Sequence, residues 1–587
     1  MKKILFITLA AVLAVFTGCE KEYAPPVLET PASETVETSK SVDLTFNYTA
    51  EGGFKSSSVT ATNGSATVTT DGTDGETSGS IIVTFTAGDE AGAGSVTLDI
   101  FDSKDQTDAA TAVISVYEAG APEITSPSST DVEVIKSVDL TFTIAAESGY
   151  SSSTVTATKG SAEVKTEPSA GAVEGEVVVT FTAGRETGAG SVELTVTDEN
   201  NKNGIANAVL DIKDVSTVSV SDNIDTDTTW ETGKVYILEG RIAVLDGVTL
   251  TIEPGVVVKG REGSGSNATA LMVARGGKLM AEGTDSSPII FTSVADHILP
   301  GEIESPNLEP TLDGLWGGVI ILGKAPISAD ASAVQIEGIP ASDPNGLYGG
   351  SEENDSSGEI RYISIRHGGA NIGEGNEING LTMGGVGSGT IIENVEVIAN
   401  QDDGLEWFGG TVDVTNVLVW NAGDDAIDTD QAWAGTLNNF LLICGEKTDH
   451  AFEIDGPEGT YLDAHTIKNG SVKGNTSDSE LGDFRDGARM TLENIYFFGF
   501  GDPAASGGRG DFSLSGDETK DNFANEILTF NNLEITPADG VDLQTIFKDG
   551  THVHASTVDA GANTVGADAS VFQGWSWAAV SGATNDF

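Results

Sequence analysis

The stretch TIIENVEVIANQDDGLEWFGG (residues 390–410) is followed by TVDVTNVLVWNAGDDAIDTDQAWAG (411–435) and by TLNNFLLICGEKTDHAFEIDGPEG (436–459). The three segments repeat one order of residue types, and the first step of the repeat is 22 residues. Repeats of about this length are typical of chains that stack one small structural unit on the next. Residues 390–459 therefore decide the fold of the part of the chain around them.

Particular polar side chains return at matching places in this repeat. The matching residues are Asn394 and Asn416, Asp403 and Asp425, and Glu406 and Asp428, with Asn439, His450 and Glu453 in a looser third copy. Between them run short alternating segments such as IIENVEVI and VDVTNVLV, closed by Gly and Asp, which is the pattern of strands. No helical pattern separates the copies, so the sequence predicts a parallel β-helix with its function on an external face.

Composition agrees with an all-β chain and excludes some partners. The 587 residues include 72 Gly and 17 Pro, and they are too many for one compact domain. The formal net charge is −61, from 90 acidic and 29 basic residues. Such a chain repels phosphates, so a nucleic-acid partner is excluded. The acidity fits either solubility in an extracellular medium or divalent-cation binding by clustered Asp.

The N-terminus has the features of an export signal. Lys2 and Lys3 precede a short apolar run, and Thr17, Gly18 and Cys19 follow it. A Cys directly after a Gly resembles the bacterial lipobox, which predicts that residues 1–19 form a lipoprotein signal with lipidation at Cys19. The alternative is an ordinary signal peptide with an incidental Cys. Residues 20–35 are polar and contain Pro, as expected of a tether, so the lipid would be the only membrane attachment.

A second repeat, with a period of 96 residues, precedes the β-helix. KSVDLTF occurs at 40–46 and again at 136–142, and VTFTAG occurs at 83–88 and 179–184. Each copy contains several short alternating strands, which predicts two immunoglobulin-like β-sandwiches at 36–119 and 120–214. We expect them to act as spacers, with glycan binding by their loops as the alternative.

The β-helix is expected at 222–587, after a linker around residues 213–227. Loops at 296–313, 340–358 and 501–522 interrupt it, and insertions of this kind tend to lie on one face. The tail contains Trp575 and Trp577. We expect it to cap the last rung, with a carbohydrate-stacking pair of indoles as the alternative. His552 and His554 alternate as on a strand.

The strings NEINGLTMGGVGSGTIIENVEVIANQDDGLEWFGGTV, NAGDDAIDTDQAW and DSSGEIRYISIRHGG resemble a family of β-helix lipoproteins common in Bacteroidetes. The resemblance covers the chain from about Trp230 onward. It implies a right-handed, pectin-lyase-like parallel β-helix on the exterior of the outer membrane, and it implies no settled activity.

If residues 22 apart lie over one another, the acids of the repeat form columns. Like charges about 5 Å apart repel, so such columns need counter-ions, raised pKa values or hydrogen bonds from turn amides. We expect Ca²⁺ to bridge the turns, because it accepts many oxygen ligands. The predicted ligands are Asp402, Asp403, Glu406, Asp424, Asp425, Asp428 and Asp430. The alternative is that these Asp side chains cap the turns through backbone amides.

Catalysis on polysaccharides is a further possibility, because many β-helix proteins cleave acidic glycans. A lyase needs Ca²⁺ and a basic residue, and a hydrolase needs two or three nearby carboxylates. The candidate residues are Arg366, His367, Asp403 and Asp425. The alternative is that the Arg residues only neutralise neighbouring acids.

Aromatic side chains interleave with the acids. Trp faces stack on sugar rings, so Trp407 and Trp433, which follow the acidic turns, are predicted to form an exposed ligand-binding platform. Trp420 ends an alternating strand and is expected to fill the core instead.

The first functional hypothesis is a non-catalytic surface lipoprotein whose Ca²⁺-stabilised β-helix binds an extracellular glycan or a protein partner. A polysaccharide lyase or hydrolase using the same face is the second. Cation capture together with an outer-membrane receptor is the third.

Overall fold

In the computed structural model, the described residues are 23–117, 120–199, 201–371, 378–476, 479–505 and 509–587. The chain divides into two compact units, one ending at Asp214 and the other beginning at Val215. The predicted signal peptide with Cys19 lies outside the described residues. Within the described ranges, no helix is both long enough and apolar enough to span a bilayer.

The first unit contains two β-sandwiches. The strands of the first are β1 (Val27–Leu28), β2 (Glu34–Glu37), β3 (Ser41–Thr49), β4 (Phe54–Thr62), β5 (Gly64–Thr70), β6 (Ser78–Ala87), β7 (Gly92–Asp102) and β8 (Thr107–Tyr117). Those of the second are β9 (Glu123–Thr125), β10 (Thr130–Glu133), β11 (Ser137–Ala145), β12 (Tyr150–Thr158), β13 (Gly160–Thr166), β14 (Glu174–Ala183), β15 (Gly188–Asp198) and β16 (Asn203–Lys213).

The pairing order of these strands is that of an immunoglobulin-like fold. In the first sandwich the two sheets have the orders β1-β3-β6-β5 and β2-β8-β7-β4, and the second sandwich repeats this arrangement with β9 to β16. The alternating residues Leu44, Phe46 and Tyr48 of β3 point into the core, as the period-2 pattern requires. The predicted sandwiches are thus confirmed.

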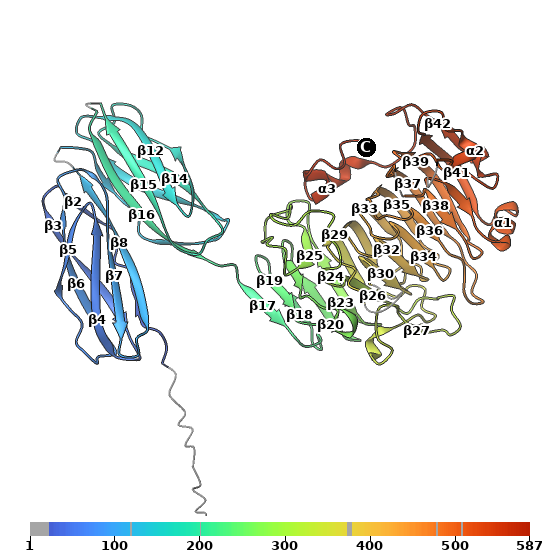
Figure 1. The fold of residues 1–587 in the computed structure, drawn as a ribbon, viewed down its shortest axis with the longest axis horizontal. Coiled ribbons are helices and arrows are strands. Elements are labelled where there is room, and N and C mark those ends of the chain that lie inside the picture. The colour runs from blue at the N-terminus through green and yellow to red at the C-terminus, as the bar shows by residue number, and fades with distance from the viewer. Residues whose placement is uncertain (1–22, 118–119, 200, 372–377, 477–478, 506–508) are drawn as a thin grey trace, which may run out of the picture. The chain divides into compact units, whose positions relative to one another are not determined.

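The second unit is a parallel β-helix whose strands stack into two long sheets (Figure 1). The larger sheet contains β17 (Thr217–Val220), β18 (Thr228–Trp230), β19 (Val235–Leu238), β21 (Thr249–Ile252), β22 (Val257–Gly260), β24 (Lys278–Glu282), β25 (Ile289–Ser293), β29 (Gly358–Arg366), β31 (Ile391–Ile398), β33 (Val414–Trp420), β35 (Thr436–Ile443), β37 (His465–Lys473), β39 (Met490–Phe498), β41 (Thr529–Thr536) and β42 (Ala555–Thr557). The smaller sheet contains β20 (Arg241–Val244), β23 (Ala270–Val273), β26 (Val319–Leu322), β30 (Leu381–Gly384), β32 (Leu405–Phe408), β34 (Ile427–Asp430), β36 (Phe452–Ile454), β38 (Gly482–Phe484) and β40 (Phe512–Leu514).

In its described residues the β-helix also carries a small hairpin and three α-helices. The hairpin strands are β27 (Val334–Gln335) and β28 (Leu347–Tyr348), and the helices are α1 (Asp517–Ala524), α2 (Leu543–Ile546) and α3 (Trp577–Val580). The first strand of the large sheet, β17, already pairs in parallel with β19, so the sheet starts before the expected boundary at residue 222.

The long strands of the larger sheet bend at one residue, and this explains the repeated asparagine. β29 pairs with β24 before Tyr362 and with β25 after it, and Tyr362 itself has a φ of 48°. In later rungs the bend is held by Asn394, Asn416, Asn439, Asn469, Asn494 and Asn532, whose φ values lie between 52° and 61°. Asn tolerates this left-handed conformation better than other non-glycine residues. Neighbouring amides also pair, since Asn416 Nδ2 donates to Asn394 Oδ1 at 2.9 Å.

The C-terminal tail returns along the outside of the larger sheet, and the prediction that it caps the last rung is wrong (Figure 1). Trp575 packs with Leu418 and Leu441, two apolar side chains that face outward from the middle of the sheet and need cover. Trp577 packs nearby against Ile398. Both indoles are buried, so they do not form an exposed carbohydrate-stacking pair either.

The prediction that His552 and His554 lie on a strand is wrong. His552 and His554 lie in a 3-10 turn, Thr551–His554, and not on a strand. Cys444 is buried in the core of the β-helix, and burial raises the pKa of its thiol to about 12.

Candidate metal centre on the acidic ladder

Successive strands of the smaller sheet stack acidic side chains on its outer face. Glu406 of β32 lies beside Asp428 of β34, and Asp428 lies beside Glu453 of β36. The predicted stacking of residues 22 positions apart is therefore confirmed. We call the set Asp402, Asp403, Glu406, Asp424, Asp425, Asp428, Asp430, Asp449, His450, Glu453, Asp455 and Glu480 the acidic ladder.

The turns that lead into these strands form a column of side-chain-to-backbone hydrogen bonds. The N–H of Asp425 donates to Asp403 Oδ1 at 2.9 Å. The N–H and the ring Nδ1 of His450 lie 2.7 Å and 2.8 Å from Asp425 Oδ1. Asn379 begins the column, since its Oδ1 accepts the N–H of Asp403 at 3.3 Å. Turn capping thus accounts for Asp403 and Asp425.

A long insertion between β26 and β29, residues 323–357, covers part of the outer face of the smaller sheet and contributes to the burial of the ladder. Phe408 of β32 packs in one apolar cluster with Ile327, Ile339 and Tyr348 of the insertion. The hydroxyl of Tyr348 donates to Gln431 Oε1 at 2.9 Å. Around the ladder Asp403 is 6% exposed, Glu406 4% and Asp428 8%. Carboxylates at this depth require compensation.

Three groups of ladder residues bring oxygen or nitrogen atoms within 4.8 Å of one another among the described residues. The groups are Asp403 with Glu406 and Asp428, Asp402 with Asp403 and Asp424, and Asp425 with His450 and Glu453. The predicted ligands thus fall into three groups, two of which share Asp403, and Asp430 belongs to none of them.

The cluster of Asp403, Glu406 and Asp428 has the least internal compensation. Burial, followed by the negative charge of neighbouring acids, raises the pKa of all three carboxyls well above their ordinary values. Glu406 accepts a hydrogen bond from Asn379 Nδ2. Asp428 Oδ1 is buried and has no hydrogen-bond partner among the described residues. Turn capping does not explain this atom, so Asp428 needs a proton or a cation.

Arginines neutralise the later rungs of the ladder. Arg485 forms ion pairs with Glu453 and, at 2.6 Å, with Asp455. Arg509 forms ion pairs with Asp449 and, at 2.7 Å, with Glu480. These clusters already hold positive charge and need a metal less.

Asp425 and Glu453 share a hydrogen bond, and their pKa values move apart. Burial raises the pKa of Asp425, but hydrogen bonds from His450 and Glu453 outweigh it and lower the pKa. Burial and the bond to Asp425 raise the pKa of Glu453 to about 10. Burial disfavours charge on the His450 ring, yet the bond to Asp425 outweighs it and raises the pKa of His450. Glu453 is thus the proton donor of the pair at neutral pH.

Trp407 and Trp433 are not an exposed platform, and that prediction is wrong. Both indoles are 0% exposed, and they stack on each other in the core with ring centroids 4.6 Å apart. The reason is alternation along β32: Glu406 faces outward, so Trp407 must face inward. Trp420, which was expected to fill the core, is only half-buried and contacts Trp577.

Arg366 and His367 do not join Asp403 and Asp425 in one catalytic site. Arg366 is fully buried at the end of β29, where its guanidinium lies 5.0 Å from the Trp577 ring centroid. Its nearest acid partner is Glu396, 3.7 Å away. Different acids act on Asp403, namely Asp425, Asp402 and Asp424. Arg366 therefore serves to neutralise an acid under the C-terminal tail.

Sequence reasoning missed Asn379 and Arg509 as parts of this site. The string Asn379-Gly380-Leu381 matches Asp403-Gly404-Leu405 and could have identified the first. Arg509 lies in a loop, and no periodicity in the sequence places it beside Asp449.

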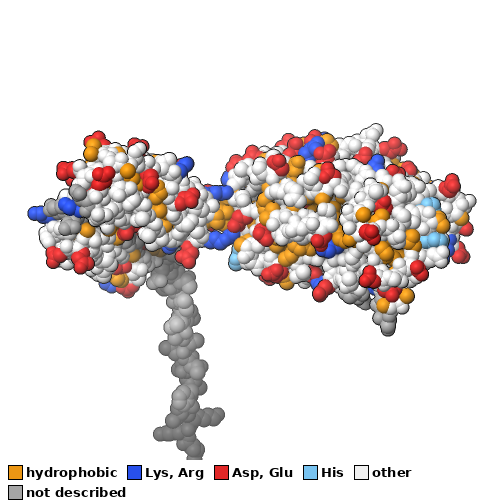
Figure 2. Space-filling model, turned by 90° about the horizontal axis from the view of Figure 1, so that it is seen from above, with side chains coloured by type: hydrophobic (Ala, Val, Ile, Leu, Met, Phe, Trp, Pro, Cys, Tyr) orange, Lys and Arg blue, Asp and Glu red, His pale blue; other side chains and the backbone are white. Residues whose placement is uncertain are grey.

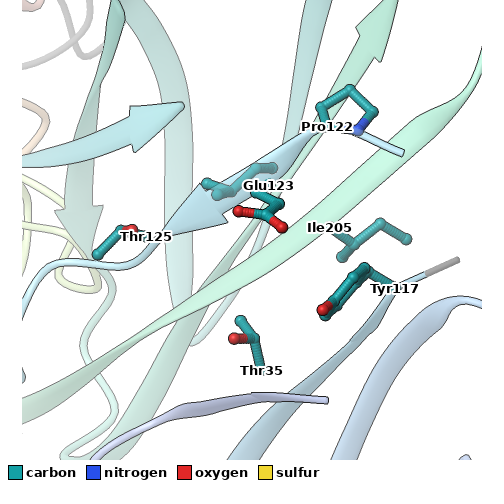
Figure 3. A pocket seen from close by; sticks show the side chains of 7 residues that line it. Thr35, Tyr117, Pro122, Glu123, Thr125 and Ile205 are labelled. Carbon is teal, nitrogen blue, oxygen red and sulfur yellow. The ribbon is translucent and has the colours of Figure 1, made fainter. Parts of the chain in front are cut away.

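Elsewhere, a small pocket lies within the first unit (Figure 3). Thr35 and Tyr117 of the first sandwich line it together with Glu123 and Ile205 of the second. Its volume is about 160 Å³. Ligand pockets usually exceed about 300 Å³, so this one is not a candidate functional site.

Comparison with known proteins identifies the longer unit. No curated protein matches the chain. Similar solved structures include the sialic acid binding region of a Streptococcus sanguinis adhesin bound to 3'sLn, with 6% identity over 34% of this chain and 83% of that one and a TM-score of 0.15. The N-terminal Ig1-2 module of a Drosophila receptor protein tyrosine phosphatase shows 13% identity over 32% of this chain and 100% of that one, with a TM-score of 0.14. TM-scores this low support no conclusion. The model of the pectate-lyase-like β-helix domain matches residues 222–580, which is more than half of the chain, and the chain therefore belongs to that family.

Proposed function

We propose that this chain is a non-catalytic, lipid-anchored surface protein whose β-helix holds a Ca²⁺ ion in the acidic ladder and binds an extracellular glycan or protein partner. The observation that carries the proposal is the buried cluster of Asp403, Glu406 and Asp428, in which Asp428 Oδ1 has no partner among the described residues. A divalent cation would neutralise the cluster in place of protons.

The donor set suits Ca²⁺. Three carboxylates carry six oxygen atoms, and Ca²⁺ takes about six to eight oxygen ligands in flexible geometry. The cluster contains no sulfur or imidazole ligand, so a softer transition metal is less favoured. When bound, the cation would fix the three carboxylates in their ionised form and tie β32 to β34.

The predicted anchor and the acidic surface support placement outside the cell. Cys19 would carry the lipid, and the two sandwiches would act as spacers. Acidic side chains are spread over the face drawn in Figure 2, which suits solubility in a salt-containing medium.

Calorimetric titration of Ca²⁺ into the chelator-treated full chain tests the metal proposal. We expect heat of binding and a rise in melting temperature, both lost in Asp428→Asn. Glu446→Gln, which removes one exposed carboxylate outside the ladder, is the matched control and should keep both. Absence of heat and of any thermal shift in the native sequence would disprove the metal site.

A second candidate function is cleavage of a polysaccharide, and the Asp425–Glu453 pair favours it. Carboxyl pairs whose pKa values are driven apart are typical of acid–base catalysis. Glu453 would donate a proton while Asp425 remains ionised. Incubation with acidic and neutral polysaccharides separates the two functions: new reducing ends or ultraviolet-absorbing products, lost in Asp425→Asn, would replace the binding proposal.

A further inference from the structure

Three segments distant in the sequence meet around a pocket of about 440 Å³. The loop at 304–310 forms one wall, and Trp577 and Ser581 of the C-terminal tail form another. Trp420, at the end of β33, completes the lining. The volume lies within the usual range for small-molecule sites, about 300–1,000 Å³.

The loop wall is held in place by hydrogen bonds. Buried Asp296 accepts the hydroxyl of Ser305 at 2.8 Å, and Asn307 Nδ2 donates to the carbonyl of Ala295 at 2.9 Å. Asn421 Nδ2 donates to the carbonyl of Pro310 at 2.6 Å, which fixes the far end of the loop beside Trp420. The wall is therefore prebuilt and needs no ligand to order it.

The tail wall is fixed as well. The N–H of Ala578, one residue after Trp577, donates to the buried carboxylate of Glu396 at 2.9 Å. The ring of Trp577 meets that of Trp420 edge-on, with centroids 6.1 Å apart. Trp420 remains half-buried, whereas the other six tryptophans, all among the described residues, are at most 3% exposed. Trp420 is thus the indole available to a ligand.

The chemistry of the lining selects against anions. Glu304 and Glu309 are exposed, and neither carboxylate forms an ion pair or hydrogen bond among the described residues. The lining contains no Lys or Arg. An acidic sugar would therefore meet two carboxylates and no exposed counter-charge in the lining, since Arg366 behind Trp577 is fully buried. A neutral sugar would stack an apolar face on Trp420 and donate its hydroxyl hydrogens to Glu304 and Glu309.

We propose that this pocket, which we call the Trp420 pocket, is a binding site for a neutral sugar ring of an extracellular glycan. It deepens the proposed function and rests on it, because it names the glycan class that the β-helix would bind. The site is separate from the acidic ladder, so sugar binding should not require Ca²⁺.

Protection of tryptophan from acrylamide quenching tests this site in the full chain. The probes are neutral tetrasaccharides of glucose, xylose, mannose and galactose, with tetragalacturonate as the anionic and spermidine as the cationic comparison. We expect at least one neutral tetrasaccharide to reduce quenching and the other two compounds to leave it unchanged. Trp420→Ala should abolish the protection, and calorimetry should show affinity lowered at least tenfold.

A double substitution, Glu304→Gln with Glu309→Gln, tests the polar contacts without touching the core, and it decides the question if Trp420→Ala does not fold. We expect a three- to tenfold loss of affinity, with Glu446→Gln as the matched control that loses none. Protection by spermidine or by tetragalacturonate, protection by no neutral sugar, or full affinity in the double variant would overturn the assignment. Asp428→Asn should bind sugar normally, so failure of the metal site and failure of this pocket give different results.

Discussion

The acidic ladder has two halves that differ in how their buried negative charge is compensated. The first half contains Asp403, Glu406 and Asp428, and the second contains the acids of the later rungs, Asp449, Glu453, Asp455 and Glu480. In the second half, Arg485 and Arg509 lie against the acids of later rungs and supply positive charge from the protein itself. In the first half, Asp403, Glu406 and Asp428 stack as closely, yet no ion pair with Lys or Arg reaches any of the three among the described residues. The strand register is the same, so the fold does not cause the difference.

This contrast shows which acids of the ladder depend on protons or cations from the solution. A carboxyl paired with arginine has its counter-charge within the protein and needs no cation from solution. A buried carboxyl without such a partner keeps its proton or takes up a cation. Between pH 5 and pH 8 the loss of protons should therefore act mainly on the first half, because Glu453 of the second half has a pKa of about 10 and keeps its proton over this range. Each prediction below tests this difference.

The largest expected effect is that of pH on the metal-free protein. Burial and neighbouring acids raise the pKa of Asp430 to about 8 and that of Asp424 to about 6, and they raise those of Asp403, Glu406 and Asp428 as well. A raised folded-state pKa means that the native state holds more protons than the unfolded state, so stability falls as pH rises above about 4. We expect the free energy of unfolding to drop by on the order of 3 kcal/mol between pH 5 and pH 8.

Denaturant unfolding in chelator at a series of pH values measures this slope, and a repeat with saturating Ca²⁺ provides the control. The cation replaces the protons, so the slope should flatten and the stabilisation by Ca²⁺ should grow with pH. A metal-free stability that stays constant or rises from pH 5 to pH 8 would contradict the assignment of raised pKa values to the first half.

Removal of Arg485 should have the next largest effect. Arg485→Ala leaves Glu453 and Asp455 without their counter-charge, and breaking a buried pair costs about 3–5 kcal/mol. The Arg485 side chain is 37% exposed, so solvent screening reduces the expected loss to about 1–3 kcal/mol at pH 7. Thermal and denaturant unfolding give the value. Arg485→Lys should recover part of it, because the ammonium keeps the charge but loses the two-pronged geometry.

Much of this fold follows from local rules that can be read in the sequence. The bend residue repeats because Asn tolerates a left-handed φ, and the 22-residue step fixes which acids lie side by side. The opposite directions of Glu406 and Trp407 were also readable, since neighbours on a strand face opposite sides. The prediction of an exposed Trp platform was wrong because it ignored that alternation.

Other features depend on contacts that no periodicity encodes. The insertion that covers Phe408 and the loop that brings Arg509 to Glu480 are fixed by tertiary packing. The tail lies on the larger sheet because Leu418 and Leu441 face outward there, and no pattern in the sequence pairs these two residues with the tail. These elements complete both the ladder and the Trp420 pocket. Sequence reasoning identified the acids and offered turn capping and arginine as ways to compensate them, but it did not show which group compensates which acid.

Substitution of Asp428, whose Oδ1 has no hydrogen-bond partner among the described residues, should stabilise the protein, whereas most substitutions of buried residues destabilise it. Asp428→Asn keeps the shape of the side chain and removes the charge that forms at high pH. In chelator at pH 8 we expect the free energy of unfolding to rise by about 1 kcal/mol, with little change at pH 5 where the carboxyl is protonated. Denaturant unfolding at the two pH values measures the difference, and Asp424→Asn, on the exposed edge of the ladder, should change it less. Destabilisation at both pH values would show that a favourable interaction other than a proton or a cation already stabilises the Asp428 carboxylate.

The smallest effect is expected at the outer arginine. Arg509→Gln breaks the pair with Glu480 and the pair with Asp449, whose side chains are 18% and 34% exposed, compared with 12% and 16% for the partners of Arg485. More solvent around the charges weakens their attraction, so we expect a loss of about 0.5–1 kcal/mol that shrinks in 1 M salt. Denaturant unfolding at low and high salt measures it, with Arg485→Ala as the comparison. If the two arginine substitutions lower the free energy of unfolding by the same amount, the burial of the partner acids does not set the strength of these ion pairs. Burial alone would then not explain why the first half of the ladder needs a cation.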